Sequence, residues 1–275
     1  MAVHQLVGWI FWDPDGVAAL EARGVPDGLG YYVVTRAAPL LPAGPKAVAA
    51  SYYSINPVFI EAVVNHFHEH ATPVDAWEVR NDAVAAGLQR YAPEICDDLA
   101  AMAPELWAVV DELPMSGRVL FAAHLGAPRP DNALVSAWLA VNCIREWRGD
   151  THWAVLLTED IDGVQAGLLH DAHLNYGDWI AQSRGADEAA IAAAMAGLEA
   201  RGLAADGRVN DAGLALREHI ERRTDELSER PWRILGADRS ESFVSLVGSA
   251  AETLVGRIDD TAGTEWMPAV RGRRP

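Results

Sequence analysis

The stretch DWIAQSRGADEAAIAAAMAGLEARGLAADGRVNDAGLALREHIERRTDEL, residues 178–227, decides the fold expected for this chain. Its glycines, an Asp-Gly pair and an asparagine divide it into a short helix, a turn, a second helix, a hairpin and a last helix. These parts are residues 178–184, Gly185, 186–201, 204–210 and 211–227. Helix, turn, helix, wing and helix is the order of a winged helix-turn-helix domain, so the chain is predicted to contain one.

The second helix of this stretch does not have the charge of a DNA reader. In such readers it enters the major groove, and basic side chains hold the phosphates. Here the helix carries Asp187, Glu188 and Glu199 against Arg201, and the hairpin offers only Arg208. We therefore expect a domain with the shape of a DNA-binding unit that does not bind nucleic acid.

The composition indicates an acidic, folded protein. The chain has 275 residues and a formal net charge of −17, which disfavours nucleic acid and acidic membranes as partners. Cys96 and Cys143 provide neither a disulfide framework nor zinc-ligand spacing, so we expect buried, reduced thiols. The apolar run 6–12 is too short for a membrane span and lacks the features of a signal peptide, which favours a cytoplasmic protein.

Proline and glycine breaks predict a mainly α fold with two parts. Residues 1–115 are expected to form an N-terminal helical domain, residues 116–257 the winged-helix domain and residues 258–275 a flexible tail. The segment ALEARG at 19–24 resembles GLEARG at 197–202. If this similarity reflects an internal repeat, the N-terminal domain is a degenerate winged helix fused to the second one. The alternative is that the two segments are similar by chance, in a chain rich in Ala, Leu, Glu and Arg.

Three blocks carry a resemblance to a known family. They are WLAVNCIREWRGDTHWAVLL at 138–157, GYYVVTRAAPLLPAGP at 30–45, and residues 198–232. Together they resemble a largely uncharacterised actinobacterial family of helix-turn-helix proteins related to MarR regulators. The resemblance implies a mostly helical fold with a MarR-like half and no defined activity. The stretch NHFHEHATP at 65–73 departs from the family pattern.

The block around residue 145 could carry chemistry. A helix is expected over 133–147, then a turn at Gly149-Asp150, and a helix start or a strand over 151–158. Arg145 and Arg148 share a helix face and could grip an anion, with His152 beyond them as an acid or base. Alternatively, the arginines favour the helix C-terminus, Gly149 ends the helix and Asp150 caps the next one.

Aromatic residues suggest what an anion site here would accept. The chain has ten tryptophans, and these fill a core or line a pocket. The residues expected to bind an aromatic or anionic ligand, besides the two arginines, are Tyr31, Tyr53, Trp138 and Trp147. MarR-like proteins bind aromatic ligands in a crevice beside the winged domain, so two fused halves would enclose such a crevice within one chain.

A histidine-rich helix end offers a metal site as a weaker alternative. His66, Glu69 and His70 fall on one helix face, and HFHEH fits the inverted zincin pattern. A solvated helix end with no metal explains the same residues.

Three functions remain open at this point. The favoured one is a small-molecule-binding protein, with or without enzymatic activity, on a winged-helix scaffold that no longer binds DNA. The alternatives are a transcriptional regulator of the MarR type and a metal-dependent hydrolase that uses the histidine helix. No phosphate-binding loop or nucleophile elbow is present, so neither a cofactor nor a reaction is assigned. The protein is expected to be a monomer or a homodimer.

Overall fold

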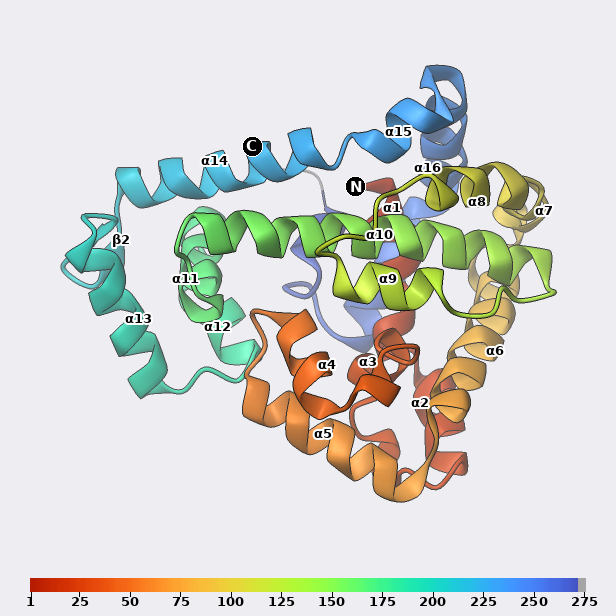
Figure 1. Cartoon of the computed structure of the whole chain (residues 1–275), viewed down its shortest axis with the longest axis horizontal. Helices are drawn as coiled ribbons and strands as arrows, with labels where there is room; N and C mark the ends of the chain where they lie inside the picture. Colours follow the sequence, from red (N-terminus) through yellow and green to blue (C-terminus); the bar gives the residue numbers. More distant parts are fainter. Residues whose placement is uncertain (272–275) are drawn as a thin grey trace.

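The longest helix, α10 (Ala133–Thr158), runs through the middle of the molecule and contacts α1, α6, α7, α8, α9 and α14 (Figure 1). The structure is a computed structural model that describes residues 1–271. These residues are mainly helical, with a single two-stranded antiparallel sheet. A mainly α fold was the expectation from the sequence.

Eight α-helices precede residue 115 in the described chain. They are α1 (Ala2–Gly8), α2 (Pro14–Ala22), α3 (Tyr31–Arg36), α4 (Pro45–Tyr52), α5 (Pro57–His70), α6 (Pro73–Tyr91), α7 (Pro93–Ala101) and α8 (Ala103–Asp111). Short 3-10 helices lie at Trp9–Trp12, Pro26–Gly28 and Leu41–Ala43. Several of the α-helices start at a proline behind a side-chain cap: Asp13 accepts from Gly16 N, and Thr72 forms a capping box with Asp75.

The second part of the chain holds the remaining elements. They are α9 (Val119–Leu125), α10, α11 (Gly163–Leu174), α12 (Trp179–Ser183), α13 (Glu188–Ala200), β1 (Ala204–Ala205), β2 (Arg208–Val209), α14 (Asp211–Leu227), α15 (Arg230–Leu235), α16 (Ala237–Thr261) and a 3-10 helix at Pro268–Val270. We call residues 163–227 the hairpin unit. It lies at one end of α10, and α14 returns alongside α10 (Figure 1).

The hairpin unit has the predicted order of elements. Gly185, with φ +86°, separates α12 from α13, and Asp206-Gly207 turns the chain between β1 and β2 with positive φ at both residues. Asn210 then caps α14 by accepting from Ala212 N and Gly213 N. Among residues 1–271, β1 and β2 are the only strands, so the segment after 19–24 has no counterpart of this hairpin.

The turn expected at Gly149-Asp150 is wrong. α10 continues through both residues to Thr158, and the side chain of Asp150 caps α9 by accepting from Phe121 N at 2.9 Å. A glycine inside a helix costs only about 1 kcal/mol, which the packing of a largely buried helix outweighs. An added Cβ at Gly149 would meet a Glu146 oxygen at 3.7 Å, an ordinary van der Waals contact, so the packing does not require a glycine there.

The main core crosses the expected boundary near residue 115. It joins buried residues of α1 and α6–α8 to those of α10 and α16, including Trp9, Trp138 and Phe243. Cys96 and Cys143 are buried and unpaired. The division into domains therefore stays a prediction, while the packing itself is continuous.

The segment expected to be a loose tail is packed as far as it is described. α16 ends at Thr261, Val270 is buried, and Arg271 pairs with Asp259. Residues 272–275 lie outside the described residues. No helix of the described chain has both the length and the apolar composition needed to cross a membrane.

Candidate ligand-binding cavity

A cavity of about 1780 Å³ lies where the N-terminal helices, α10, the hairpin unit and the C-terminal segment meet. Ligand pockets in proteins usually measure roughly 300–1,000 Å³, so this one has room for a small organic molecule and water. The sequence placed a pocket at this junction, with Arg145 or Arg148 and His152 at its polar end. All three residues line the cavity, as does Tyr31.

α10 brings the predicted polar residues together. Arg145, Arg148 and His152 occupy positions i, i+3 and i+7 of the helix and therefore share one face. His152 joins the two arginines on this face only because α10 does not stop at Gly149, so its position depends on the part of the helix that the sequence did not predict.

Arg145 belongs to a buried ion-pair cluster. Arg36 holds Glu146 with two parallel hydrogen bonds of 2.9 and 2.7 Å, and Arg145 donates to the same carboxylate at 2.5 Å. The Glu146 side chain is 1 % exposed. Burial alone would raise the pKa of Glu146, but Arg36 and Arg145 outweigh it and lower the pKa to about 2. The cluster thus joins α3 to α10.

Arg148 is also paired with protein carboxylates. Its guanidinium donates to Glu221 at 3.2 Å and to Asp225 at 2.8 Å, both on α14. These pairs tie α10 to the hairpin unit. The expectation that the two arginines favour a helix C-terminus is wrong, because α10 continues to Thr158. Ion pairs at the cavity wall account for their main contacts instead.

His152 has one ring nitrogen in use. Its Nδ1 lies 2.9 Å from the hydroxyl of Thr224, and that hydroxyl donates its own hydrogen to Ile220 O. The Thr224 oxygen must therefore accept, so the neutral ring carries its proton on Nδ1 and leaves Nε2 as an acceptor. Burial lowers the pKa of His152 to about 4. The charge of Glu221 raises this pKa, and the charges of Arg148 and Arg184 lower it further.

Aromatic rings form a chain along the cavity wall. Trp12 stacks on Tyr32, with ring centres 6.0 Å apart, and also contacts Trp266 at 5.0 Å. Trp266 in turn meets Trp179 edge-on at 5.0 Å. The four rings come from the N-terminal part, α12 and the segment after α16, and all line the cavity.

Three aromatic residues expected at the site do not line the cavity. Trp138 is 1 % exposed and donates to Leu6 O, and Trp147 donates to Pro114 O. Tyr53 stacks on Trp153 and donates to Ile161 O. Their indole and phenol groups instead satisfy backbone carbonyls, so packing between helices explains them.

Arg184 is a cavity residue that the sequence did not indicate. It follows α12 directly, and its side chain has no hydrogen bond or ion pair with any residue in the described range. Burial lowers its pKa, although Tyr32 and Asp171 act in the opposite direction. The nearby acids Asp187 and Glu188 lie beyond the turn at Gly185 and do not pair with it.

His170 of α11 lies on the same wall. Its ring has no hydrogen-bond partner among residues 1–271, and burial, followed by Arg217 and Arg184, lowers its pKa to about 3. Its neighbour Asp171 has a structural role, because it accepts from Ile180 N and Ala181 N at the start of α12.

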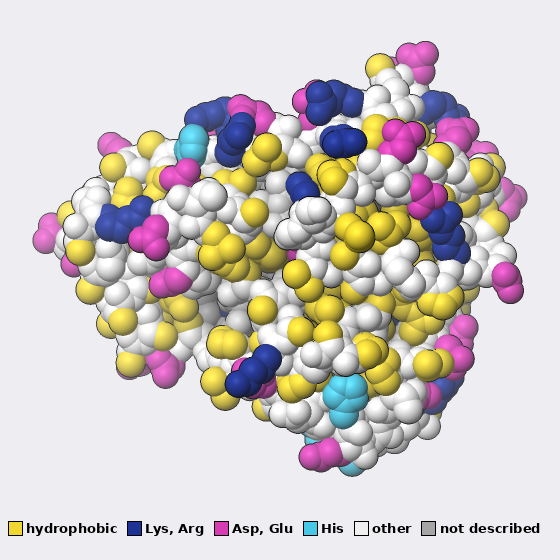
Figure 2. Space-filling model, in the orientation of Figure 1, with side chains coloured by type: hydrophobic (Ala, Val, Ile, Leu, Met, Phe, Trp, Pro, Cys, Tyr) yellow, Lys and Arg dark blue, Asp and Glu magenta, His cyan; other side chains and the backbone are white. Residues whose placement is uncertain are grey.

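The exposed side of α13 carries no basic residue. Its exposed side chains are alanines and the glutamates Glu188 and Glu199. Arg201, which follows the helix, donates to Asp160 O and Glu159 O at the end of α10. On the face shown in Figure 2, the few dark-blue side chains at this end of the molecule stand beside magenta ones.

The histidine helix has metal-binding geometry at a separate place. Donor atoms of His66, Glu69 and His70 lie within 4.8 Å of one another on α5. None of the three residues lines the cavity. They could hold a metal ion, and the expectation that they do not stays a prediction.

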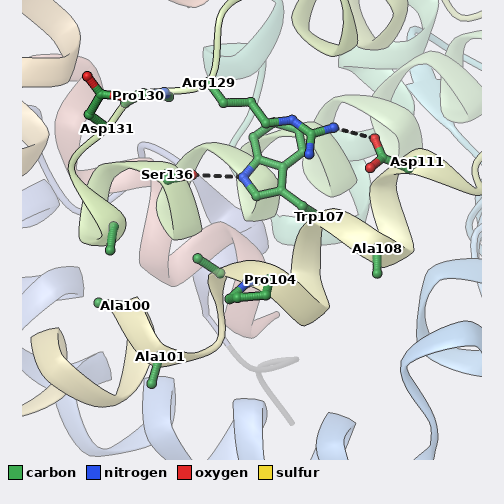
Figure 3. A pocket seen from close by; sticks show the side chains of 12 residues that line it. Ala100, Ala101, Pro104, Trp107, Ala108, Asp111, Arg129, Pro130, Asp131 and Ser136 are labelled. Atoms are coloured by element: carbon green, nitrogen blue, oxygen red, sulfur yellow. Dashed lines mark hydrogen bonds and ion pairs between the residues drawn. The ribbon is translucent and has the colours of Figure 1, made fainter.

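A second hollow beside α8 has a different character (Figure 3). In it the guanidinium of Arg129 lies 4.0 Å from the ring centre of Trp107 and pairs with Asp111, while Trp107 donates to Ser136. Every polar side chain in that contact set already has a partner. The hollow therefore offers less to a ligand than the central cavity does.

Comparison with known proteins identifies a family. No curated protein and no solved structure matches the chain significantly. A family model described as a helix-turn-helix family matches residues 1–259, which include the whole cavity except its C-terminal edge. The protein therefore belongs to a helix-turn-helix family.

Proposed function

We propose that this protein binds a small aromatic molecule in the central cavity. The observation that carries the proposal is the chain of rings from Trp12 to Trp179 on the wall of a 1780 Å³ cavity. Such rings offer flat apolar surface to a ligand, and polar groups such as His152 Nε2 would fix its orientation.

The test uses 2-naphthamide, an uncharged bicyclic aromatic, as the probe in isothermal titration calorimetry. We expect one molecule to bind per chain. Ser183 lines the cavity and donates to Ile180 O, so Ser183→Trp should fill the space and abolish binding. Ser249 on α16 is exposed and makes the corresponding bond to Leu246 O, so Ser249→Trp is the matched control and should bind normally. Equal binding by both variants, or none by the wild type, would refute the proposal.

The hairpin unit supports a winged-helix arrangement of the MarR type, in which α13 occupies the position of the recognition helix and β1–β2 that of the wing. We propose that this unit does not hold duplex DNA, although the family match favours a regulator. Much of the affinity for duplex DNA comes from Lys and Arg that neutralise phosphates, and the exposed side of α13 offers only alanine and glutamate.

Fluorescence anisotropy with a random duplex tests this part. At physiological salt we expect no binding at micromolar protein. Replacing the two exposed acids, as Glu188→Lys with Glu199→Lys, should create weak, salt-sensitive binding if charge is what the helix lacks. Sub-micromolar binding by the wild type that weakens with added salt would establish a DNA-binding regulator instead.

A further inference from the structure

We infer that Arg184 is the receptor for a single carboxylate group on the cavity ligand, so that the protein selects aromatic monocarboxylates. This inference rests on the proposed function, because it names the chemical class that the same cavity accepts. It assigns the charge recognition to a residue other than the two arginines that the sequence indicated.

The arginines around the cavity differ in whether the protein neutralises them. Six line it, namely Arg36, Arg145, Arg148, Arg184, Arg217 and Arg271. Five of them pair with carboxylates. Arg36 and Arg145 pair with Glu146, and Arg148 pairs with Glu221 and Asp225. Arg217 pairs with Glu218, and Arg271 pairs with Asp259. Among these six, only Arg184 has no carboxylate of residues 1–271 within ion-pair distance.

Leaving this guanidinium unpaired is unfavourable, because burial penalises the charged form, as its lowered pKa reflects. The nearest acid that acts on it, Asp171, uses both of its oxygens to accept from Ile180 N and Ala181 N. A ligand anion would therefore supply the partner that the protein does not. A guanidinium offers two parallel N–H donors, which match the two oxygens of a carboxylate.

The surroundings favour a single charge. Glu229 lines the same cavity without an ion pair among residues 1–271, so it disfavours a second negative charge on the ligand. The neutral rings of His152 and His170, both of whose pKa values Arg184 helps to lower, add hydrogen-bonding positions without further positive charge.

The backbone around Arg184 is held in place. Its carbonyl accepts from Asn56 N at 2.8 Å, and Gly185 O accepts from Asn56 Nδ2 at 2.9 Å. Asn56 is itself the N-cap of α5. The residue is thus fixed between the N-terminal part and the hairpin unit, which reduces the ordering cost when a ligand binds.

Calorimetry with a pair of probes tests the inference. 2-Naphthoate and 2-naphthamide have nearly the same shape and differ in charge. We expect the wild type to bind the carboxylate roughly tenfold or more tightly than the amide, as for a desolvated ion pair. In Arg184→Met the two affinities should become equal, while the amide still binds. Arg222→Met removes the same charge from an exposed position of α14 and should keep the preference.

The outcomes separate the two proposals. If the wild type binds both probes equally, or if Arg184→Met keeps the preference, the inference fails and the aromatic cavity stands. If neither probe binds the wild type, both fail. Thermal melting of the ligand-free protein adds a second readout: Arg184→Met should melt at or above the wild-type temperature, since it removes a partly buried cation that has no carboxylate partner among residues 1–271. A sharp loss of stability would show that Arg184 is structural and would overturn the inference.

Discussion

The cavity and the exposed side of α13 differ in their basic side chains. A helix-turn-helix protein that binds DNA is expected to carry such side chains on the outer helix, but here they line the cavity and are absent from the exposed side of α13. The outer helix carries alanine and glutamate, whereas the interior of this acidic chain holds six arginines. Five of the six are neutralised by protein carboxylates, which stabilise the junction of the helices. The difference teaches that the arginines at the cavity join elements of the fold, while Arg184 has no carboxylate partner among residues 1–271.

The largest effect should come from breaking the ion pair between Arg36 and Glu146. Arg36→Ala leaves a buried carboxylate with only Arg145, which should cost about 3–5 kcal/mol and lower the melting temperature by on the order of 10 °C. Arg239 makes the same two-bond contact to Glu105 at the surface, where both side chains are nearly half exposed. Arg239→Ala is therefore the matched control and should cost less than about 1 kcal/mol. Similar losses in both variants would remove the distinction between interior and surface.

Acid should weaken the interior more than the surface. The ordinary pKa of a histidine ring is 6.5, and in the folded protein the pKa of His170 is lowered to about 3. Between these two pH values the ring is protonated in the unfolded chain but neutral in the folded protein. Stability from this group is therefore present above pH 6.5 and is lost as the pH falls toward 3. Between pH 6.5 and 4.5, His170→Gln should lose roughly 2–3 kcal/mol less than the wild type in urea titrations.

His68→Gln changes an exposed histidine of α5 outside the cavity and serves as the control for that experiment. It should follow the wild-type pH profile. A His170→Gln profile parallel to that of the wild type would mean that the folded protein protonates this ring as readily as the unfolded chain does.

A smaller effect is expected at Arg145. Arg145→Ala removes one of the two partners of Glu146, but Arg36 retains contact with both carboxylate oxygens. We expect the melting temperature to fall by only a few degrees and 2-naphthamide binding to remain. Loss of probe binding at unchanged stability would return this arginine to the role of ligand anchor that the sequence suggested.

Local signals in the sequence were sufficient for the hairpin unit. Gly185, the Asp206-Gly207 turn and the Asn210 cap act on neighbouring residues, and the last helix was predicted at 211–227, where α14 lies. α10 was predicted only to residue 147, because the burial that carries it past Gly149 comes from distant elements.

The site was predicted in part for the same reason. The i, i+3 spacing of Arg145 and Arg148 placed them on one face. Arg36, which shares the Glu146 carboxylate with Arg145, and Glu221, which pairs with Arg148, are far away in the sequence. Trp138 and Trp147 are aromatic in the same way as Trp12 and Trp179, and only the fold decides which rings meet the cavity. Arg184 stands out because no side chain of residues 1–271 pairs with it, and that is a property of the folded chain.

A crystal structure of the protein soaked with 2-naphthoate tests the central claim most directly. The account predicts one probe molecule inside the cavity, with its rings against Trp12 or Tyr32 and its carboxylate on the guanidinium of Arg184. A probe seated elsewhere on the molecule, with the cavity unoccupied at saturating concentration, would contradict it.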